Sequence, residues 1–420
     1  MQIYLGPLGR HRDFVRLWGA QTVSSFGSRI TRTALPVIAI LMVTADPMQI
    51  AMLSALEVTP AVLVGLFASG FVDRHDKRPV LVVADIMRAA LVFSVPLAAW
   101  FGDLGMAQLY LVAAIVGAFS ALFELADNAF LPVLIGRDRL VEGNSKLQAT
   151  DSVAEIGGPG LAGVLIQLLT APVTMLIDAA SYIVSAVLLA GIRSTEVRVP
   201  SSAAPPSLIE DIRVGARAGF GHPVVGPTFW SFAIGDLSNG FFMALYTLYA
   251  LQTLQMDVAT LGIVISLGGV SALGGAFVAS TVSKRLGLGR ALIVTLAVGR
   301  AAGMFVVFAA LAPAYGVAWL SAAQLVGDGA MVAFLILANS YRQAVLPLDV
   351  MARANGLLQV MTGVLLPLGA LIAGVLAAAT SVTLVIFVGA SIGLLALIPL
   401  LRPTIFGLRD PDVSISATAA

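Results

Sequence analysis

The stretch that decides the fold is G-F-V-D-R-H-D-K-R, from Gly70 to Arg78, in which five of the nine residues carry charge. It stands between two apolar runs, residues 51–69 and 80–99, each of about the length that crosses a bilayer as a helix. A short charged segment between two such runs is typical of the turn between membrane helices. The stretch therefore predicts a helical hairpin in a membrane, with this turn on one side of the bilayer.

The composition of the whole chain also indicates a membrane protein. Of its 420 residues, 59% are hydrophobic and 11% are charged, against roughly 25% charged residues in a soluble domain. The mean hydropathy is +0.96. Because runs of about 20 apolar residues mark transmembrane helices, we predict an all-α membrane protein with twelve spans. They lie at residues 15–43, 50–71, 79–100, 106–126, 144–170, 172–192, 226–253, 259–282, 290–312, 316–338, 355–379 and 381–401.

Several function classes find no support in the sequence. The chain has no cysteine, so it has neither a disulfide nor a thiolate metal site. It also lacks the G-x-x-x-x-G-K-(S/T) loop of an ATP-driven pump, and its three histidines, His11, His75 and His222, have no metal-ligand spacing. We expect no enzyme activity, no cofactor, no metal site and no nucleic-acid partner.

The distribution of basic residues predicts the orientation of the chain. Cytoplasmic loops collect Lys and Arg near the ends of spans. Four of the 24 Lys and Arg residues fall deep inside predicted spans, and all the others lie in the two tails, in alternate loops or within three residues of those span ends. The opposite loops contain Asp46, Asp103 and Asp257 but no base. We therefore expect a multi-pass protein of the cell (plasma) membrane with both termini in the cytoplasm.

Internal similarity predicts two halves of one plan. A shift of 212 residues places Trp18 on Trp230 and Arg88 on Arg300, and a shift of 211 places Asn128 on Asn339. Six spans per repeat give both copies the same orientation, as in transporters built from parallel halves. We predict six-helix bundles at 1–192 and 224–402, a cytoplasmic linker at 193–223 with a surface helix near 210–217, and a cytoplasmic tail at 403–420.

The charged turn resembles the loop between spans 2 and 3 of the major facilitator superfamily, where D-R-x-(G/D)-(R/K)-R recurs. Here Gly70 precedes Asp73, Arg74, Asp76, Lys77 and Arg78. The resemblance implies that Asp73 contacts the start of span 11 when the cytoplasmic side is closed, where a helix start favours negative charge. The basic residues would support this gate. The alternative is a loop that serves only as positive-inside charge.

Span 5 contains G-G-P-G-L-A-G, from Gly157 to Gly163, in which Gly158, Pro159 and Gly163 resemble the exporter signature of the same superfamily. An ordinary kinked packing seam accounts for these residues equally well, since small residues allow close helix approach and proline bends a helix. The stretches F-V-R-L-W-G-A-Q-T-V-S at Phe14 and L-V-E-G-N-S-K-L-Q at Leu140 are similar to bacterial multidrug, macrolide and enterobactin exporters.

Ionisable residues inside the predicted spans are candidates for proton coupling, because each is costly in lipid. Two bases, Arg29 and Arg32, accompany three acids, which are Glu57, Glu155 and Asp178. At least one of these acids therefore lacks an arginine partner. Such an acid is able to load and release a proton. We rank Glu155 first, with Asp151 one turn earlier, and then Glu57 and Asp178. The alternative is that all of them form structural ion pairs, as we expect for Asp85 with Arg88.

In the superfamily that the chain resembles, spans 1, 4, 7 and 10 line a central cavity. The resemblance therefore implies a cavity wall that combines aromatic and polar side chains. Such a wall favours an amphiphilic substrate. They are Gln21, Ser25, Phe123, Asp236, Asn239, Phe242, Tyr246, Gln324 and Asp328.

Together these features predict a proton-coupled exporter of amphiphilic small molecules such as drugs, macrolides or siderophores, working by alternating access as a monomer. An importer of the same fold is the first alternative. A lipid-moving or ligand-sensing membrane protein is the second.

Overall fold

The computed structural model describes residues 7–193 and 208–408, and within these two ranges every regular element is a helix. Ten of the helices in the described ranges are long and apolar enough to span a membrane. Two further long helices, α1 (Arg12–Leu41) and α9 (Val225–Leu248), lie outside this set of ten. These twelve helices follow the predicted spans in order, which confirms the all-α membrane fold. The other ten are α2 (Pro47–Phe67), α4 (Lys77–Phe101), α5 (Met106–Ile135), α6 (Leu140–Leu169), α7 (Ala171–Ala190), α10 (Val258–Leu286), α11 (Leu288–Leu311), α12 (Gly316–Val345), α13 (Leu348–Ala379) and α14 (Val382–Leu395).

Several helix ends differ from the predicted ones, because an apolar run marks only the part of a helix that matches lipid. The fourth span was predicted to end at residue 126, but α5 continues to Ile135 and stops where Gly136 takes a φ of 76°. Glycine adopts such a positive φ readily because it has no Cβ. The last span, predicted at 381–401, runs from Val382 to Leu400, but α14 ends within it at Leu395, and Pro399, which lacks a backbone donor, lies in a separate 3-10 turn.

The charged stretch is also more regular than the predicted turn. Residues Ser69–Arg74 form a short helix, α3, and only His75 and Asp76 separate it from α4. The turn predicted between the two membrane helices therefore includes a helical segment, because Ser69 to Arg74 contains no proline and only one glycine, and a helix satisfies its own backbone groups.

The chain divides into two compact units. Unit 1 comprises Met1–Ala45, Leu56–Ala204 and Asp257–Ser266, and unit 2 comprises Asp46–Ala55, Pro205–Met256 and Leu267–Ala420. Part of the predicted linker, at 194–207, and the end of the predicted tail, at 409–420, lie outside the described residues. After the first gap the chain forms α8 (Leu208–Gly221), a helix at the predicted place that packs against α13 and α9 in unit 2.

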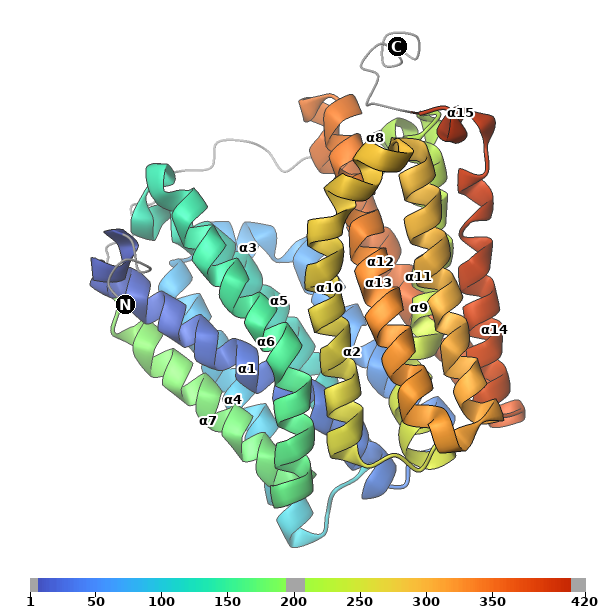
Figure 1. Cartoon of the computed structure of the whole chain (residues 1–420). Coiled ribbons are helices and arrows are strands. Elements are labelled where there is room, and N and C mark those ends of the chain that lie inside the picture. The colour runs from blue at the N-terminus through green and yellow to red at the C-terminus, as the bar shows by residue number, and fades with distance from the viewer. Residues whose placement is uncertain (1–6, 194–207, 409–420) are drawn as a thin grey trace. The chain divides into compact units, whose positions relative to one another are not determined.

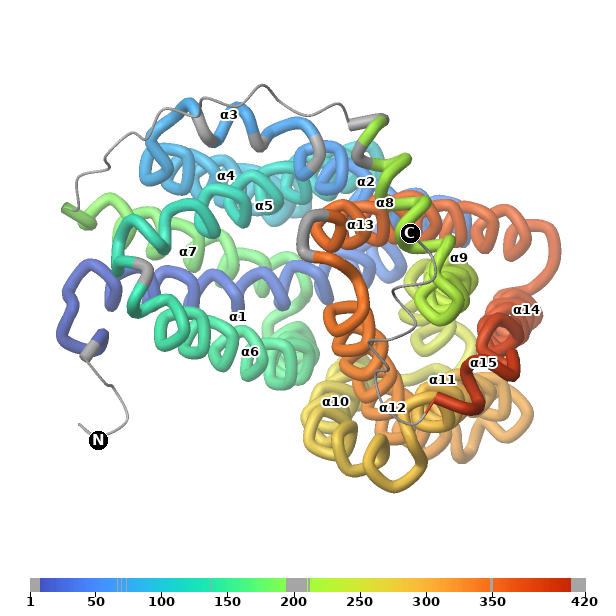
Figure 2. The backbone as a smooth tube through the Cα atoms, turned by 90° about the horizontal axis from the view of Figure 1, so that it is seen from above, coloured from blue at the N-terminus to red at the C-terminus, as the bar shows by residue number. Residues whose placement is uncertain are grey.

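In unit 1, α1 lies between α6 and α7, and α7 also packs along α4 (Figures 1 and 2). Small residues allow these close approaches. A Cβ on Gly158 of α6 would lie 2.5 Å from the Cβ of Arg29, and a Cβ on Gly27 would overlap Ser181 and Asp178 of α7. Since lipid provides no hydrophobic drive between helices, such close packing is a main source of helix association.

In unit 2, α9 packs against α13 and α14, and α11 packs against α12 and α14 (Figure 1). Large buried side chains that include Phe229, Phe334 and Tyr341 form one apolar core at one end of this unit. The short helix α15 (Pro403–Phe406) closes that end, because the backbone N–H of Gly289 at the start of α11 donates to the Leu408 carbonyl at 2.9 Å.

Candidate functional site

The residues of the charged stretch connect α3 and α4 to the end of α7. Gly70 and Arg74 are exposed on α3, and the side chain of Asp73 lies outside what the structure describes. Lys77 donates its Nζ to the His75 carbonyl at 2.9 Å. Arg78 donates from Nε to the Leu189 carbonyl at 3.2 Å and from its terminal nitrogen to the Ala190 carbonyl. A cation at the last carbonyls of a helix is favourable, so Arg78 caps α7.

A second arginine contacts the same helix end. Arg16 on α1 donates to the Gly191 carbonyl at 2.5 Å and to Asp13 Oδ1 at 2.9 Å. The other oxygen of Asp13 accepts from the Arg193 backbone N–H at 3.2 Å. The end of α7 is thus fixed to α1 and α4, a convergence that no sequence pattern marks.

Acids engage both arginines that were predicted to lie deep in the first span, Arg29 and Arg32. Arg29 pairs with Asp151 at 3.2 Å and also with Glu155, and both acids lie on α6. Arg32 donates from Nε to Glu57 on α2 at 3.3 Å. The side chain of Glu155 is 54% exposed. The carboxylate that we ranked first as lacking a partner therefore has an arginine beside it.

Asp178 on α7 is the acid of this set that has no arginine ion pair among the described residues. It is fully buried, its Oδ1 accepts from the Ser181 hydroxyl at 3.0 Å, and its Oδ2 has no hydrogen-bond partner. Within the described part of the chain no ion pair reaches it. Of the three acids, Asp178 is thus the one left without an arginine ion pair. The packing of the helices identifies it, because the sequence does not show which acid faces which arginine.

Asp178 belongs to a larger buried polar cluster between α1, α4 and α7. Asp85 and Arg88 of α4 pair with each other, as predicted, and are 0% and 4% exposed. The guanidinium of Arg88 lies 4.5 Å from the ring of Phe123 and 4.4 Å from the ring of Tyr182, within cation–π range. Several atoms of this cluster lack a hydrogen-bond partner, namely Thr31 Oγ1, Asp85 Oδ2, Arg88 Nε, Asp178 Oδ2 and Ser185 Oγ.

A wide cavity of about 960 Å³ lies in unit 1 between α1, α5 and α6. Two of the predicted wall residues, Gln21 and Ser25, line it, and Gln21 donates to Asp127 at 2.5 Å. The predicted wall residue Phe123 is not in its lining and packs on Arg88 instead. The wall is polar, with carboxamide, hydroxyl and carboxylate groups predominating.

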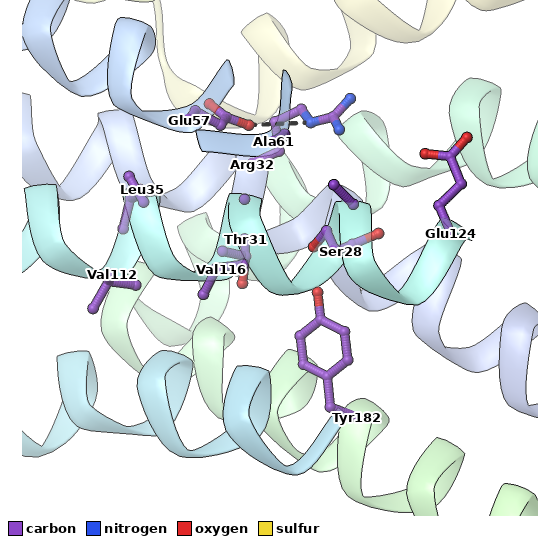
Figure 3. A pocket seen from close by; sticks show the side chains of 14 residues that line it. Ser28, Thr31, Arg32, Leu35, Glu57, Ala61, Val112, Val116, Glu124 and Tyr182 are labelled. Atoms are coloured by element: carbon purple, nitrogen blue, oxygen red, sulfur yellow. Dashed lines mark ion pairs between the residues drawn. The ribbon is translucent and has the colours of Figure 1, made fainter. Parts of the chain in front are cut away.

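A smaller cavity of about 230 Å³ lies between α1, α2, α5 and α7 (Figure 3). The Arg32–Glu57 ion pair borders it, and the hydroxyl of Tyr182 points toward Ser28. Aliphatic side chains such as Leu35 and Val112 lie at the opposite end of the view from Glu124. This cavity combines a charged rim with an apolar floor.

In unit 2 the predicted wall residues Asp236 and Asn239 bind side chains outside the predicted wall set. Asp236 on α9 accepts from the Thr362 hydroxyl at 2.6 Å, and Asn239 accepts from Arg300 at 2.8 Å. The hydroxyl of Tyr246 is buried without a hydrogen-bond partner. Gln324 and Asp328 lie on α12 beside Gly268 of α10, where a Cβ would overlap the Asp328 carboxylate. Phe242 lies beside Gly303.

The span 5 motif forms a packing seam. Besides Gly158, a Cβ on Gly163 would lie 2.6 Å from the Val258 carbonyl, in the Asp257–Ser266 segment of the same unit. Pro159 is buried in the middle of α6, which continues through it as one helix. The glycines are therefore required for close approach.

Two titratable groups outside the spans have shifted pKa values. Burial lowers the pKa of His222, whose Nδ1 accepts from the backbone N–H groups of Val224 and Val225 at the start of α9. Hydrogen bonds from Thr260 lower the pKa of Asp257 at the start of α10. The described residues contain no group of three His, Cys, Asp or Glu side chains arranged to hold a metal ion.

Comparison with known proteins agrees with this architecture. The profile of the family described as Major Facilitator Superfamily matches residues 17–365. The chain belongs to the Major Facilitator Superfamily. Membership, together with the apolar helices, makes it a multi-pass membrane protein.

Within the superfamily, the chain is similar to two efflux proteins. It is 24% identical over 202 residues to macrolide efflux protein A of Streptococcus pyogenes, an alignment that covers 48% of this chain and 50% of that protein. It is 30% identical over 179 residues to the multidrug efflux pump Tap of Mycobacterium tuberculosis, covering 40% and 42%. The chain thus spans half or less of the length of these curated relatives.

The fold also matches a solved structure over almost its full length. A bacterial homologue of the iron transporter ferroportin, in an inward-facing state, aligns with a TM-score of 0.75 and 17% identity, covering 94% of this chain and 99% of that one. At this identity the likeness shows the fold alone.

Proposed function

We propose that the protein is a proton-coupled exporter of small organic molecules that works by alternating access in the plasma membrane. The observation that carries the proposal is Asp178, a fully buried carboxylate that no ion pair engages among the described residues. An uncompensated buried charge is costly. Asp178 is therefore suited to bind a proton in one state and release it in another.

The direction of transport follows from two kinds of support. The relatives named above are efflux proteins, and the glycine and proline residues of α6 resemble an exporter signature. Because basic residues fall in the tails and in alternate loops, we propose cytoplasmic termini. A single chain has all the groups that this mechanism uses, so we propose a functional monomer.

The gate role of Asp73 is a further part of the proposal. The stretch carries the D-R-x-D-K-R pattern, and Asp73 lies in the last turn of α3, shortly before α4 begins at Lys77. Asp73→Asn should abolish transport without lowering the amount of protein in the membrane. If this variant transported as well as the unaltered protein, Asp73 would have no gate role.

Everted membrane vesicles test the proposed function. In them an exporter carries its substrate into the lumen, and an acid interior supplies the protons that leave in exchange. We expect uptake of a transported drug under an imposed acid-inside gradient and its collapse when a protonophore is added. Uptake that ignores the gradient would exclude proton coupling, and uptake by right-side-out vesicles under an inward proton gradient would indicate an importer.

A further inference from the structure

Glu124 on α5 lines both cavities of unit 1. It is exposed, and among residues 7–193 and 208–408 no hydrogen bond or ion pair engages its carboxylate. Asp127 follows three residues later on the same helix, and its carboxylate accepts from Gln21. The two arginines nearby in sequence on α1 are occupied, Arg29 by two acids and Arg32 by Glu57. The junction of the cavities therefore offers negative charge that no protein base neutralises.

The small cavity has the properties of a pocket for one ammonium group. Thr31 borders it with a hydroxyl that is buried, 7% exposed as a residue, and without a hydrogen-bond partner. Tyr182, itself 1% exposed, directs its hydroxyl into the same space (Figure 3). An ammonium group has three donors and no acceptor, so it needs oxygen atoms of this kind around it.

The wide cavity favours a hydrophilic body for the same ligand. Of its fourteen lining residues only Leu147 and Ala149 are apolar. Pockets for drug-like molecules are lined predominantly by apolar and aromatic side chains. A wall of carboxamides and hydroxyls instead satisfies a molecule that carries many hydroxyl or amide groups of its own.

We propose that unit 1 binds a hydrophilic organic amine, with its ammonium group against Glu124 at the small cavity and its hydroxyl-rich remainder in the wide cavity. This deepens the proposed function by naming the substrate class of the same protein. It replaces the amphiphilic class expected from the sequence, since that expectation depended on aromatic wall residues such as Phe123.

Binding to the purified full-length protein in detergent, without any gradient, tests the inference. The probes are kanamycin, kanamycin with every amine N-acetylated, and ethidium. Kanamycin and its acetylated form share their hydroxyl groups and differ in charge. Ethidium, in contrast, is a cation with an apolar body. We expect kanamycin to raise the unfolding temperature in a saturable manner and the acetylated compound to leave it unchanged. Binding of the acetylated compound with equal affinity would overturn the ammonium contact, and binding of ethidium without kanamycin would overturn the hydrophilic class.

Substitutions of Glu124 test its contact with the ammonium group. Glu124→Gln should weaken kanamycin binding about ten-fold or more, because it removes a charge-assisted contact, and Glu124→Asp should restore part of the affinity. Asp103→Asn, in the exposed connection between α4 and α5, is the matched control and should bind like the unaltered protein. Unchanged binding by Glu124→Gln would remove Glu124 from the site. Binding that persists while gradient-driven uptake fails would instead count against the proposed exporter and leave this inference standing.

Discussion

Replacement of Asp178 by asparagine is the most direct test of proton coupling. The change preserves the size of the side chain and an oxygen that can accept from Ser181, whose hydroxyl lies 3.0 Å from Asp178 Oδ1. Because Asp178 has no ion-pair partner within the described ranges, the substitution breaks no salt bridge. We expect the free energy of unfolding to change by about 1 kcal/mol or less, the usual net value of one hydrogen bond.

The expected effect on transport is much larger. If one proton is exchanged per substrate molecule, each pH unit of gradient supplies about 1.4 kcal/mol, or a ten-fold accumulation of substrate. Asp178→Asn removes the group that binds the proton, so accumulation in everted vesicles should fall to the level of equilibration. The assay measures the ratio of internal to external drug at imposed gradients of zero, one and two pH units.

The matched control is Glu155→Gln, which removes a carboxylate that is half exposed and paired with Arg29. Such pairs contribute about 0–1 kcal/mol, so this variant should keep both its stability and its response to the gradient. Two results would refute the reasoning: a ten-fold response per pH unit in Asp178→Asn, or a loss of that response in Glu155→Gln. A loss of about 3 kcal/mol or more in Asp178→Asn would likewise show that an ion pair had been broken.

Three further predictions concern stability in detergent. Gly27→Val should lower the free energy of unfolding by about 1–3 kcal/mol, because its side chain would overlap Ser181 and Asp178, and an unchanged unfolding temperature would contradict this contact. Arg78→Gln should cost about 1 kcal/mol through the lost cap of α7, whereas Arg74→Gln, on exposed α3, should cost little; equal losses would argue against the cap. Burial lowers the pKa of His222 from 6.5, so the unfolded chain binds the proton first, and the stability contribution is present above pH 6.5 and lost as pH falls through the lowered pKa. The unfolding temperature should therefore drop more between pH 7 and 5 in the unaltered protein than in His222→Asn, and parallel profiles would exclude His222 as the cause.

Much of the fold follows from the sequence because a bilayer imposes a simple length rule. Runs of apolar residues gave all twelve helices in order, since each span must satisfy its backbone within itself. The rule does not apply beyond the lipid, and for that reason α5 extends past the predicted end to Ile135 and the charged stretch forms α3.

The sequence alone predicted less of the candidate site than of the fold. The pattern identified Arg29, Glu155 and Asp178 as unusual, but it did not assign their partners, because pairing depends on how α1, α6 and α7 rotate against one another. The same limit applies to Phe123, whose ring packs on Arg88, and to Glu124, which no motif distinguishes from the other polar residues of α5.

The arginine contacts at the end of α7 have a mechanical consequence. The carbonyls of Leu189, Ala190 and Gly191 accept from side chains of two other helices, so tension applied to the chain at Arg193 is divided among α1, α4 and α7. When a single molecule is pulled out of a bilayer by this point, these three helices should leave in one rupture event. Substitution of Arg16 and Arg78 together should split that event into smaller steps.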